Sequence, residues 1–347
     1  MSVSAEFRFP KPFLWGVACS SAYHSACGWR TESRWKLDFD DIADSGMNAL
    51  KISLNWSKIQ PRKDFFDISE IDYTKDLIRG ALERNIRPVV SICDGDLPGW
   101  FTDADGWKKD ESSSFFLHFV EYTLTKLPFS DVQWVTFENI DAMLPGSGIT
   151  AFFRPGDSPI HALQHIALAH HRAYQFIHGL SETTQIGIAV SSDEKYASAL
   201  PRVFQNGKFS SGLQNRTFPE YKGNLDFLLT EGKTESIPRM AEFGFPMIFM
   251  SGIDDPEDRE RPLFLARTLL SCWRNYCSGI PLLGFLYDSL NDIPEVDAKG
   301  LRKLSADSPK RIPRPSAQFY SEIIRKNALN VTDADQFASA FRKEIGL

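Results

Sequence analysis

The sequence lacks the features that would place it in a membrane or on nucleic acid. No apolar run approaches the roughly 20 residues that span a bilayer. Residues 1–10 contain no basic segment leading into an apolar stretch, so we expect neither a membrane partner nor a signal peptide. Lys and Arg form no block and the net charge is −6, which argues against a nucleic-acid partner.

Cysteines are also scarce. The five present are odd in number, irregularly spaced and without a C-x-x-C pattern, so they form neither a disulfide framework nor a zinc or redox motif. We therefore expect a cytoplasmic location, and no metal ion or other cofactor.

What the chain does contain is a regular alternation of short apolar runs with longer amphipathic stretches, which indicates βα units around a parallel sheet. Eight candidate strands can be counted: Phe13–Cys19, Ala49–Trp56, Pro88–Cys93, Val132–Phe137, Ile186–Val190, Leu225–Thr230, Met247–Met250 and Leu282–Leu286. Apolar residues at three- and four-residue spacing predict six helices: Phe39–Ser45, Ile71–Asn85, Ser112–Lys126, Pro159–Gly179, Pro262–Ser278 and Ser316–Lys326.

Eight strands with intervening helices predict a single (β/α)8 barrel. No Pro/Gly/Ser-rich linker or solenoid repeat divides the chain, so we assign residues 1–330 to the barrel and 331–347 to a helical extension packed on its outside. Ser191–Asn224 is predicted to be a long, strand-poor loop over one barrel end. Because active sites of such barrels lie at the carboxyl ends of the strands, residues just past each strand are the candidates for function.

Several segments, in order, resemble the family 1 glycoside hydrolases (β-glucosidases and relatives), whose fold is this barrel. They run from about residue 10 to about residue 327: F-L-W-G-V-A at Phe13–Ala18, then Asp38–Pro61, Arg87–Trp100, Trp134–Asn139, Asp254–Pro262 and Arg314–Tyr320. The resemblance implies a site for a glycoside or polyol at the barrel mouth.

In that family one Glu, in T-F-N-E-P after the fourth strand, is the acid/base, and a second Glu, in T-E-N-G after the seventh, is the nucleophile. Retaining hydrolysis needs such a pair about 5–5.5 Å apart. Here the fourth-strand motif reads T-F-E-N-I, so Asn139 holds the acid/base position and Glu138 the preceding one. The nucleophile position falls on Met250, or on Ser251 if the gap is shifted. A thioether cannot serve as the nucleophilic carboxylate, and no base for the serine is identifiable.

Other positions that bind the sugar or support the nucleophile in the family differ as well. Asp94 replaces a glycone-binding His, Lys51 replaces an Arg, and Glu231-Gly232 replaces an Asn-Tyr pair after the sixth strand. Glu295 matches a glycone-binding Glu, and His24 falls near a Gln of the first loop. We predict Glu138 and Glu231 as catalytic, with Asn139, Asp94, Lys51, His24, Glu295 and Trp100 binding substrate.

The remaining notable residues have ordinary interpretations beside functional ones. Trp29, Trp35, Trp100 and Trp107 can either stack on a ligand or pack in the core. The histidines of the predicted helix Pro159–Gly179 are assigned packing and surface roles: His161, His165, His170 and His171. Asp254 and Asp255 are assigned structural roles. Carboxyls crowded at one mouth would raise one another's pKa or bind a cation, although no spacing motif indicates a metal site.

Three hypotheses follow: an enzyme whose acid–base chemistry has been repurposed, a carbohydrate-binding pseudoenzyme without catalysis, and a glycosidase that works by an inverting or substrate-assisted route. The fold cannot choose among them. The orientation of Glu138 discriminates, because the repurposed enzyme fails if Glu138 points into the helix layer.

Overall fold

The computed structural model describes residues 6–19, 32–144, 158–211, 214–292, 298–304 and 311–330. Eight parallel strands form a closed barrel in the order β2, β3, β4, β5, β6, β9, β10, β11, with β11 beside β2. Their bounds are Leu14–Cys19, Ala49–Ser53, Arg87–Cys93, Gln133–Phe137, Ile186–Ser191, Phe227–Glu231, Met247–Ser251 and Leu282–Tyr287. The predicted (β/α)8 barrel is confirmed, strand by strand.

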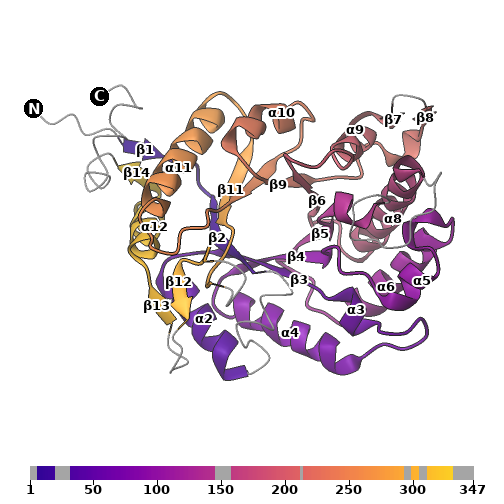
Figure 1. The fold of residues 1–347 in the computed structure, drawn as a ribbon, viewed down its shortest axis with the longest axis horizontal. Coiled ribbons are helices and arrows are strands. Elements are labelled where there is room, and N and C mark those ends of the chain that lie inside the picture. The colour runs from indigo at the N-terminus through magenta and orange to yellow at the C-terminus, as the bar shows by residue number, and fades with distance from the viewer. Residues whose placement is uncertain are drawn as a thin grey trace, which may run out of the picture.

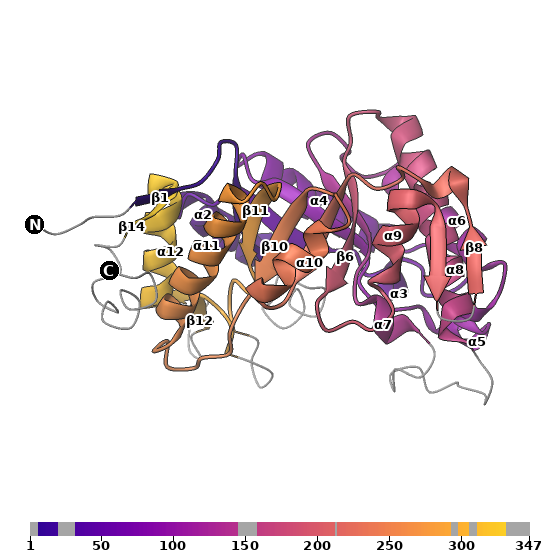
Figure 2. The same cartoon turned by 90° about the horizontal axis from the view of Figure 1, so that it is seen from above.

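Helices surround the barrel (Figure 1), with α11 and α12 on one side of the molecule and α6 and α8 on the other (Figure 2). The longer ones are α2 Glu32–Asp44, α4 Ile68–Leu82, α6 Ser112–Leu124, α8 Pro159–Leu180, α11 Arg261–Cys277 and α12 Pro315–Lys326. Shorter elements are α3 Trp56–Ile59, α5 Gly99–Asp103, α7 Ile140–Met143, α9 Ala199–Asn206 and α10 Ile237–Ala241, with 3-10 turns η1 Gly106–Lys108, η2 Pro219–Tyr221 and η3 Thr234–Ser236. All six predicted helices are present, although α2 begins at Glu32 rather than at Phe39.

Alternate residues of each strand fill the barrel interior, as the two-residue period of a strand requires. The interior cluster consists of Leu14, Ala18, Ala49, Val89, Val135, Ala189, Phe227, Leu229, Ile248, Met250 and Leu286. Intervening residues such as Trp15, Leu50 and Val90 belong to the larger cluster between strands and helices. The interior is therefore a packed apolar core, and a site must lie at an end of the barrel.

The prediction of a strand-poor loop at Ser191–Asn224 is wrong. This segment contains α9 and an antiparallel hairpin of β7 Lys208–Ser211 and β8 Gln214–Thr217. Leu200, Val203 and Phe204 bury one face of α9. Their three- and four-residue spacing is visible in the sequence, but the helix is only 8 residues long, and so short a periodic run is a weak signal.

Two small sheets complete the described chain. β1 Glu6–Arg8 pairs with β14 Ala328–Asn330, and β12 Arg302–Leu304 pairs with β13 Arg311–Pro313, both antiparallel. His24, Trp29, Glu295 and the predicted terminal helix at 331–347 lie outside the described residues.

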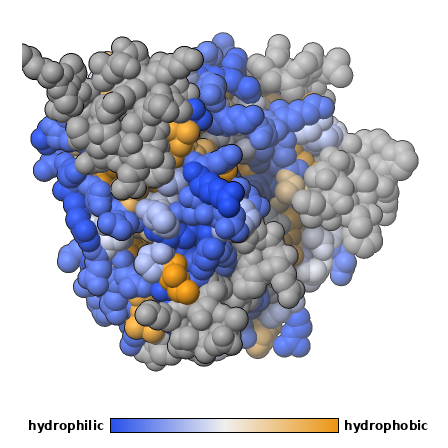
Figure 3. Space-filling view, turned by 60° about the vertical axis from the view of Figure 1, so that its left-hand side comes forward, coloured by the Kyte–Doolittle hydropathy of each residue, from blue (hydrophilic) through white to orange (hydrophobic). Residues whose placement is uncertain are grey.

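Hydrophilic residues cover most of the described surface seen in Figure 3, and apolar ones appear in small groups. The large apolar side chains exposed among the described residues are scattered, as is normal for a protein surface: Leu37, Phe65, Ile68, Leu180, Tyr276 and Ile312. Within the described ranges, no helix combines the length and apolar character needed to cross a bilayer.

Candidate active site

Charged side chains gather where the barrel strands end. Lys51 lies on β3, Glu138 directly follows β5, and Glu231 is the last residue of β9. Asp94 follows β4 and Asp288 follows β11. The four carboxyl groups therefore lie at the carboxyl-terminal end of the barrel, the end at which barrel enzymes place their active sites. Lys51 belongs to the middle of β3.

Lys51 and Glu138 form a buried ion pair. Nζ of Lys51 donates to Oε1 of Glu138 at 2.7 Å, lies 2.6 Å from Oε2, and donates to Oγ of Ser53 at 3.2 Å. Lys51 is 2% exposed and Glu138 6%. Two residues before Lys51, Ala49 belongs to the interior cluster, so the strand period directs the lysine into the barrel as well.

The end of β5 turns Glu138 toward the barrel instead of the helices. Thr136 hydrogen-bonds to His170 of α8 at 2.6 Å, and the Phe137 ring packs against Phe116 and Trp107. Two consecutive side chains thus face outward, and Glu138 turns to the opposite side. Glu138 therefore does not point into the helix layer, the orientation that would have excluded the repurposed-enzyme hypothesis.

Asn139 holds two loops together. It adopts a left-handed backbone conformation with φ 52°, and its Nδ2 donates to the carbonyl of Asp94 at 2.9 Å. Its side chain is exposed at the mouth. Its predicted role in binding substrate stays a prediction.

The electrostatics of Lys51 are governed by the carboxylates around it. Burial would lower the pKa of its ammonium group, but Glu138 raises this pKa through its charge and its hydrogen bond. The charges of Asp94 and Glu231 raise the pKa as well. The pKa of Lys51 is raised, so the ammonium group stays charged at neutral pH. Asp94 itself is half-buried beside the mouth.

The carboxyl of Glu231 has a strongly displaced pKa. Burial, followed by the charges of Asp288 and Glu138, raises this pKa to about 7 against the opposing effect of Lys51 and Lys299. These mutual effects require the five groups to lie near one another, because Coulomb interactions decay with distance. Near neutral pH Glu231 is therefore a carboxyl that can donate or accept a proton.

Two residues that influence the pKa of Glu231, Asp288 and Lys299, were not predicted from the sequence. Nζ of Lys299 lies 3.1 Å from Oδ2 of Asp288. Asp288 is the first residue after the eighth strand, so the search rule of looking just past each strand could have found it. Lys299 does not directly follow a barrel strand, so the same rule could not have found it.

Met250 lies in the strand next to Glu231. The two residues pair in register between β10 and β9, and the Met250 side chain is 2% exposed within the interior cluster. Oγ of Ser251 donates to the carbonyl of Gly232 at 2.8 Å.

The tryptophans within the described residues pack. Trp35 and Trp107 are 4% and 2% exposed. Trp100 is half-buried: its indole N–H donates to the carbonyl of Gln60 at 2.8 Å, and its ring contacts Trp56 and Phe115 edge-on. The contribution of Trp100 to substrate binding stays a prediction.

Asp255 and His170 have the structural roles assigned to them. Oδ2 of Asp255 accepts the backbone N–H groups of Glu260 and Arg261 at the start of α11. His170 is buried between Thr136 and the carbonyl of Asn224, and burial lowers its pKa to about 4. Among the described residues, no group of three or more His, Cys, Asp or Glu side chains is arranged to hold a metal ion.

Comparison with known proteins places the chain in a family. Residues 31–218, more than half of the chain, match the model of glycosyl hydrolase family 1. Curated relatives include an aryl-phospho-β-D-glucosidase of Bacillus subtilis, 25% identical over 74% of this chain and 67% of the relative, and a cytosolic β-glucosidase of Cavia porcellus, 26% identical over 47% and 36%. The chain thus spans from about a third to about two thirds of the length of these relatives.

Solved structures agree on the fold. A β-glycosidase from Pyrococcus horikoshii has a TM-score of 0.78 at 20% identity, covering 96% of this chain and 99% of the other. A β-glucosidase from Thermotoga maritima in complex with galacto-hydroximolactam has a TM-score of 0.77 at 18% identity, covering 93% and 100%. By its matched segment and its barrel, the chain belongs to glycosyl hydrolase family 1.

Proposed function

We propose that the barrel mouth binds a glycoside or a sugar-derived small molecule and performs acid–base chemistry on it. In this proposal protonated Glu231 donates its proton to the substrate, and Glu138, held by Lys51, supplies a fixed negative charge beside it. The observation that carries the proposal is the raised pKa of Glu231, about 7, at the carboxyl end of the barrel.

The arrangement gives the two carboxyls different tasks. Lys51 contacts both oxygens of Glu138 and so compensates its charge. Glu231 has burial and two neighbouring carboxylates acting against its ionisation. The proposal therefore assigns the acid to Glu231, whose environment favours the protonated form, and the fixed charge to Glu138.

We further propose that the standard retaining route is absent, because Met250 occupies the position of the nucleophile. Glu231 pairs with Met250 on the adjacent strand, so a carboxyl reaches the same sector of the mouth from one strand away. Without a nucleophilic carboxylate on β10, a hydrolytic reaction would use water directly. Water would bond to the anomeric carbon as the glycosidic bond breaks, Glu231 would give its proton to the leaving oxygen, and the proton released by the water would pass to solvent, which inverts the anomeric centre.

The relatives support the substrate class. The names of the curated relatives describe glucosidases acting on β-glucosides and aryl-phospho-β-glucosides, and the structural relatives include complexes with sugar-like compounds such as deoxynojirimycin. From these names we propose that the ligand of this chain is a sugar-derived molecule with a β-linked substituent.

A non-catalytic sugar-binding function is the second candidate. The observation that favours it is the closed Lys51–Glu138 pair, in which both side chains are almost fully buried and already satisfy each other's charge. In that case the pair maintains the shape of the mouth and Glu231 hydrogen-bonds a ligand hydroxyl.

Turnover of a panel of aryl β-glycosides, with and without a 6-phosphate, tests the proposal. We expect kcat to fall above about pH 7, as protonated Glu231 is lost, and Glu231→Gln to lower kcat by about 100-fold or more. Glu235→Gln, at an exposed position four residues along, is the matched control. NMR of the first-formed sugar should show the inverted anomer.

The outcomes separate the candidates. Sugar binding by calorimetry without turnover, weakened by Glu231→Gln and unchanged by Glu235→Gln, favours the non-catalytic function. Turnover with retained configuration that survives Glu231→Gln would remove Glu231 from the mechanism. Absence of both turnover and binding across the panel would refute the proposed substrate class.

A further inference from the structure

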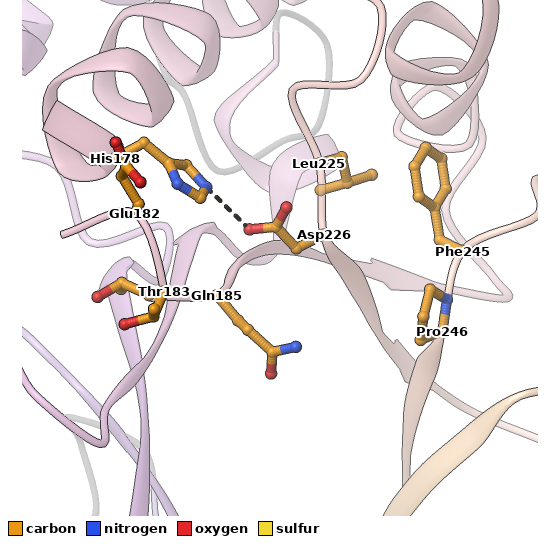
Figure 4. A pocket seen from close by; sticks show the side chains of 9 residues that line it. His178, Glu182, Thr183, Gln185, Leu225, Asp226, Phe245 and Pro246 are labelled. Atoms are coloured by element: carbon orange, nitrogen blue, oxygen red, sulfur yellow. Dashed lines mark hydrogen bonds and ion pairs between the residues drawn. The ribbon is translucent and has the colours of Figure 1, made fainter.

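A hollow lies at the opposite end of the barrel from Lys51 and Glu231. It has a volume of about 510 Å³ and is lined by the last turn of α8 and by the residues that precede β6, β9 and β10 (Figure 4). Gln185, Asp226 and Pro246 each stand immediately before a barrel strand. The hollow is thus at the amino ends of the strands and is separated from the mouth by the packed barrel interior.

One side of this hollow is polar and firmly organised. Asp226 accepts three hydrogen bonds, from Oη of Tyr174 at 2.8 Å, from the backbone N–H of Ile186 at 2.8 Å and from Nε2 of His178 at 3.1 Å. Because Nε2 is directed at Asp226, the imidazole ring of His178 is fixed and its Nδ1 is the nitrogen available to a ligand.

Gln185 and Glu182 provide further groups that can bind a ligand. Oε1 of Gln185 accepts from Gln133 at 2.6 Å, which leaves the Gln185 amide N–H groups as donors. The carboxylate of Glu182 is exposed, lies on the His178 side of the hollow in Figure 4, and is an acceptor. Figure 4 shows Gln185 between the His178 side and the Pro246 side of the hollow.

The other side is apolar. Leu225 is buried, and Phe245 and Pro246 are half-buried, lying across the hollow from His178 and Thr183 in Figure 4. The nine described residues that line the hollow include no lysine or arginine. A phosphate or another anion would therefore meet acidic side chains without a compensating cation.

We propose that this basal hollow is a second binding site that takes a neutral saccharide. A sugar ring has hydroxyls at its edge, which suit the acceptor and donor groups of Glu182, Gln185 and His178. Its C–H face suits the apolar wall at Phe245, and the hollow falls in the size range of small-ligand pockets. The site is independent of the chemistry proposed at the mouth.

Ligand-observed NMR titration with methyl β-glucoside, cellobiose, maltose, choline and inorganic phosphate tests the site. To isolate it, the measurements use both the wild-type chain and a Glu231→Gln variant, which alters the mouth and leaves the residues of the hollow unchanged. We expect a saccharide to bind both proteins, and Gln185→Ala/Phe245→Ala to weaken that binding by about tenfold or more.

Variants at exposed positions keep the test interpretable. Glu182→Ala removes only an exposed carboxylate and should weaken binding several-fold without affecting folding. Gln318→Ala and Phe65→Ala, at exposed positions away from the hollow, are the matched controls and should leave binding unchanged. The proposal would be overturned if Glu182→Ala and the double variant both bound saccharides as tightly as the wild type. Binding of choline or phosphate in place of the saccharides, or no saccharide binding at all, would also overturn it.

Discussion

The pair of Lys51 and Glu138 shows how much a single buried contact can contribute to this site. The two residues are 87 positions apart in sequence, and each is withdrawn from water by the barrel. Taking two charges out of water is costly, and their mutual attraction offsets that cost only while both are present. The pair therefore constrains stability as well as function.

Breaking this pair from one side should be strongly destabilising. We expect Glu138→Leu, which leaves Lys51 charged and unpaired, to lower the free energy of unfolding by about 3–5 kcal/mol. The double variant Lys51→Met/Glu138→Leu should recover most of that loss, because an apolar pair of similar size carries no desolvation cost. Urea unfolding measures both; a double variant as unstable as the single one would contradict this account.

The raised pKa of Glu231 predicts that the stability of the folded chain depends on pH. Its carboxyl has a pKa of about 7 in the folded chain, raised from the ordinary value of 4.5, so the folded state holds the proton more tightly. Stability from the protonated group is fully present below about pH 4.5 and is lost as the pH rises through about 7, by an amount on the order of 3 kcal/mol.

Comparison with Glu231→Gln isolates this effect. The variant cannot ionise at that position, so its advantage over the wild type should grow between pH 4 and pH 8, as followed by urea unfolding at each pH. Glu235→Gln, at the exposed position, should instead track the wild type. Parallel curves for the wild type and Glu231→Gln would show that Glu231 titrates normally.

At the scale of one element, α11 depends on Asp255 for its start. The 17-residue helix begins with backbone N–H groups that lack helical acceptors, and Asp255 accepts two of them, from Glu260 and Arg261. Burial opposes ionisation of Asp255, but these hydrogen bonds outweigh it and lower its pKa. The stabilisation is therefore present above the ordinary carboxyl pKa and is lost as the pH falls through the lowered value.

Asp255→Ala should accordingly reduce the free energy of unfolding by about 1–2 kcal/mol near neutral pH. The neighbouring Asp254 is exposed and accepts one hydrogen bond, from the backbone of Ala298 at 3.2 Å. Asp254→Ala is thus the matched control, with a smaller expected loss. Chemical denaturation of the two variants decides the assignment, and equal losses would remove the special role of Asp255.

At the scale of the whole molecule, Asn327 joins the end of the described chain to its beginning. It ends α12 in a left-handed conformation with φ 49°. Its Oδ1 accepts from the indole of Trp15 at 2.9 Å, and its Nδ2 donates to the carbonyl of Phe9 at 2.8 Å. The adjacent pairing of β14 with β1 continues this connection.

Two substitutions separate the hydrogen bonds from the backbone strain. Asn327→Gly removes the side-chain hydrogen bonds and keeps the favourable backbone, with an expected loss of about 2 kcal/mol. Asn327→Ala should cost about 1 kcal/mol more, because alanine is strained in the left-handed region. Thermal and urea unfolding provide the comparison; an Ala variant as stable as the Gly variant would refute the strain contribution.

The sequence predicted some features of this protein better than others. The barrel strands were predictable because each is a short, buried run with a clear apolar signal, as at Ile186–Ser191. The α9 helix and its hairpin were missed because their pattern is short. Asp288 was missed because resemblance directed attention to Glu295, although its place after the eighth strand marks it.

By itself, the sequence determined the eight strands, their order and the presence of carboxyl-bearing residues at their ends, because short apolar runs between amphipathic stretches can be recognised locally. Only the tertiary structure decided that Glu138 meets Lys51 and that Glu231 is influenced by Asp288 and Lys299. These pairings join segments far apart in the chain, and burial within the closed barrel, rather than residue type, sets their electrostatics.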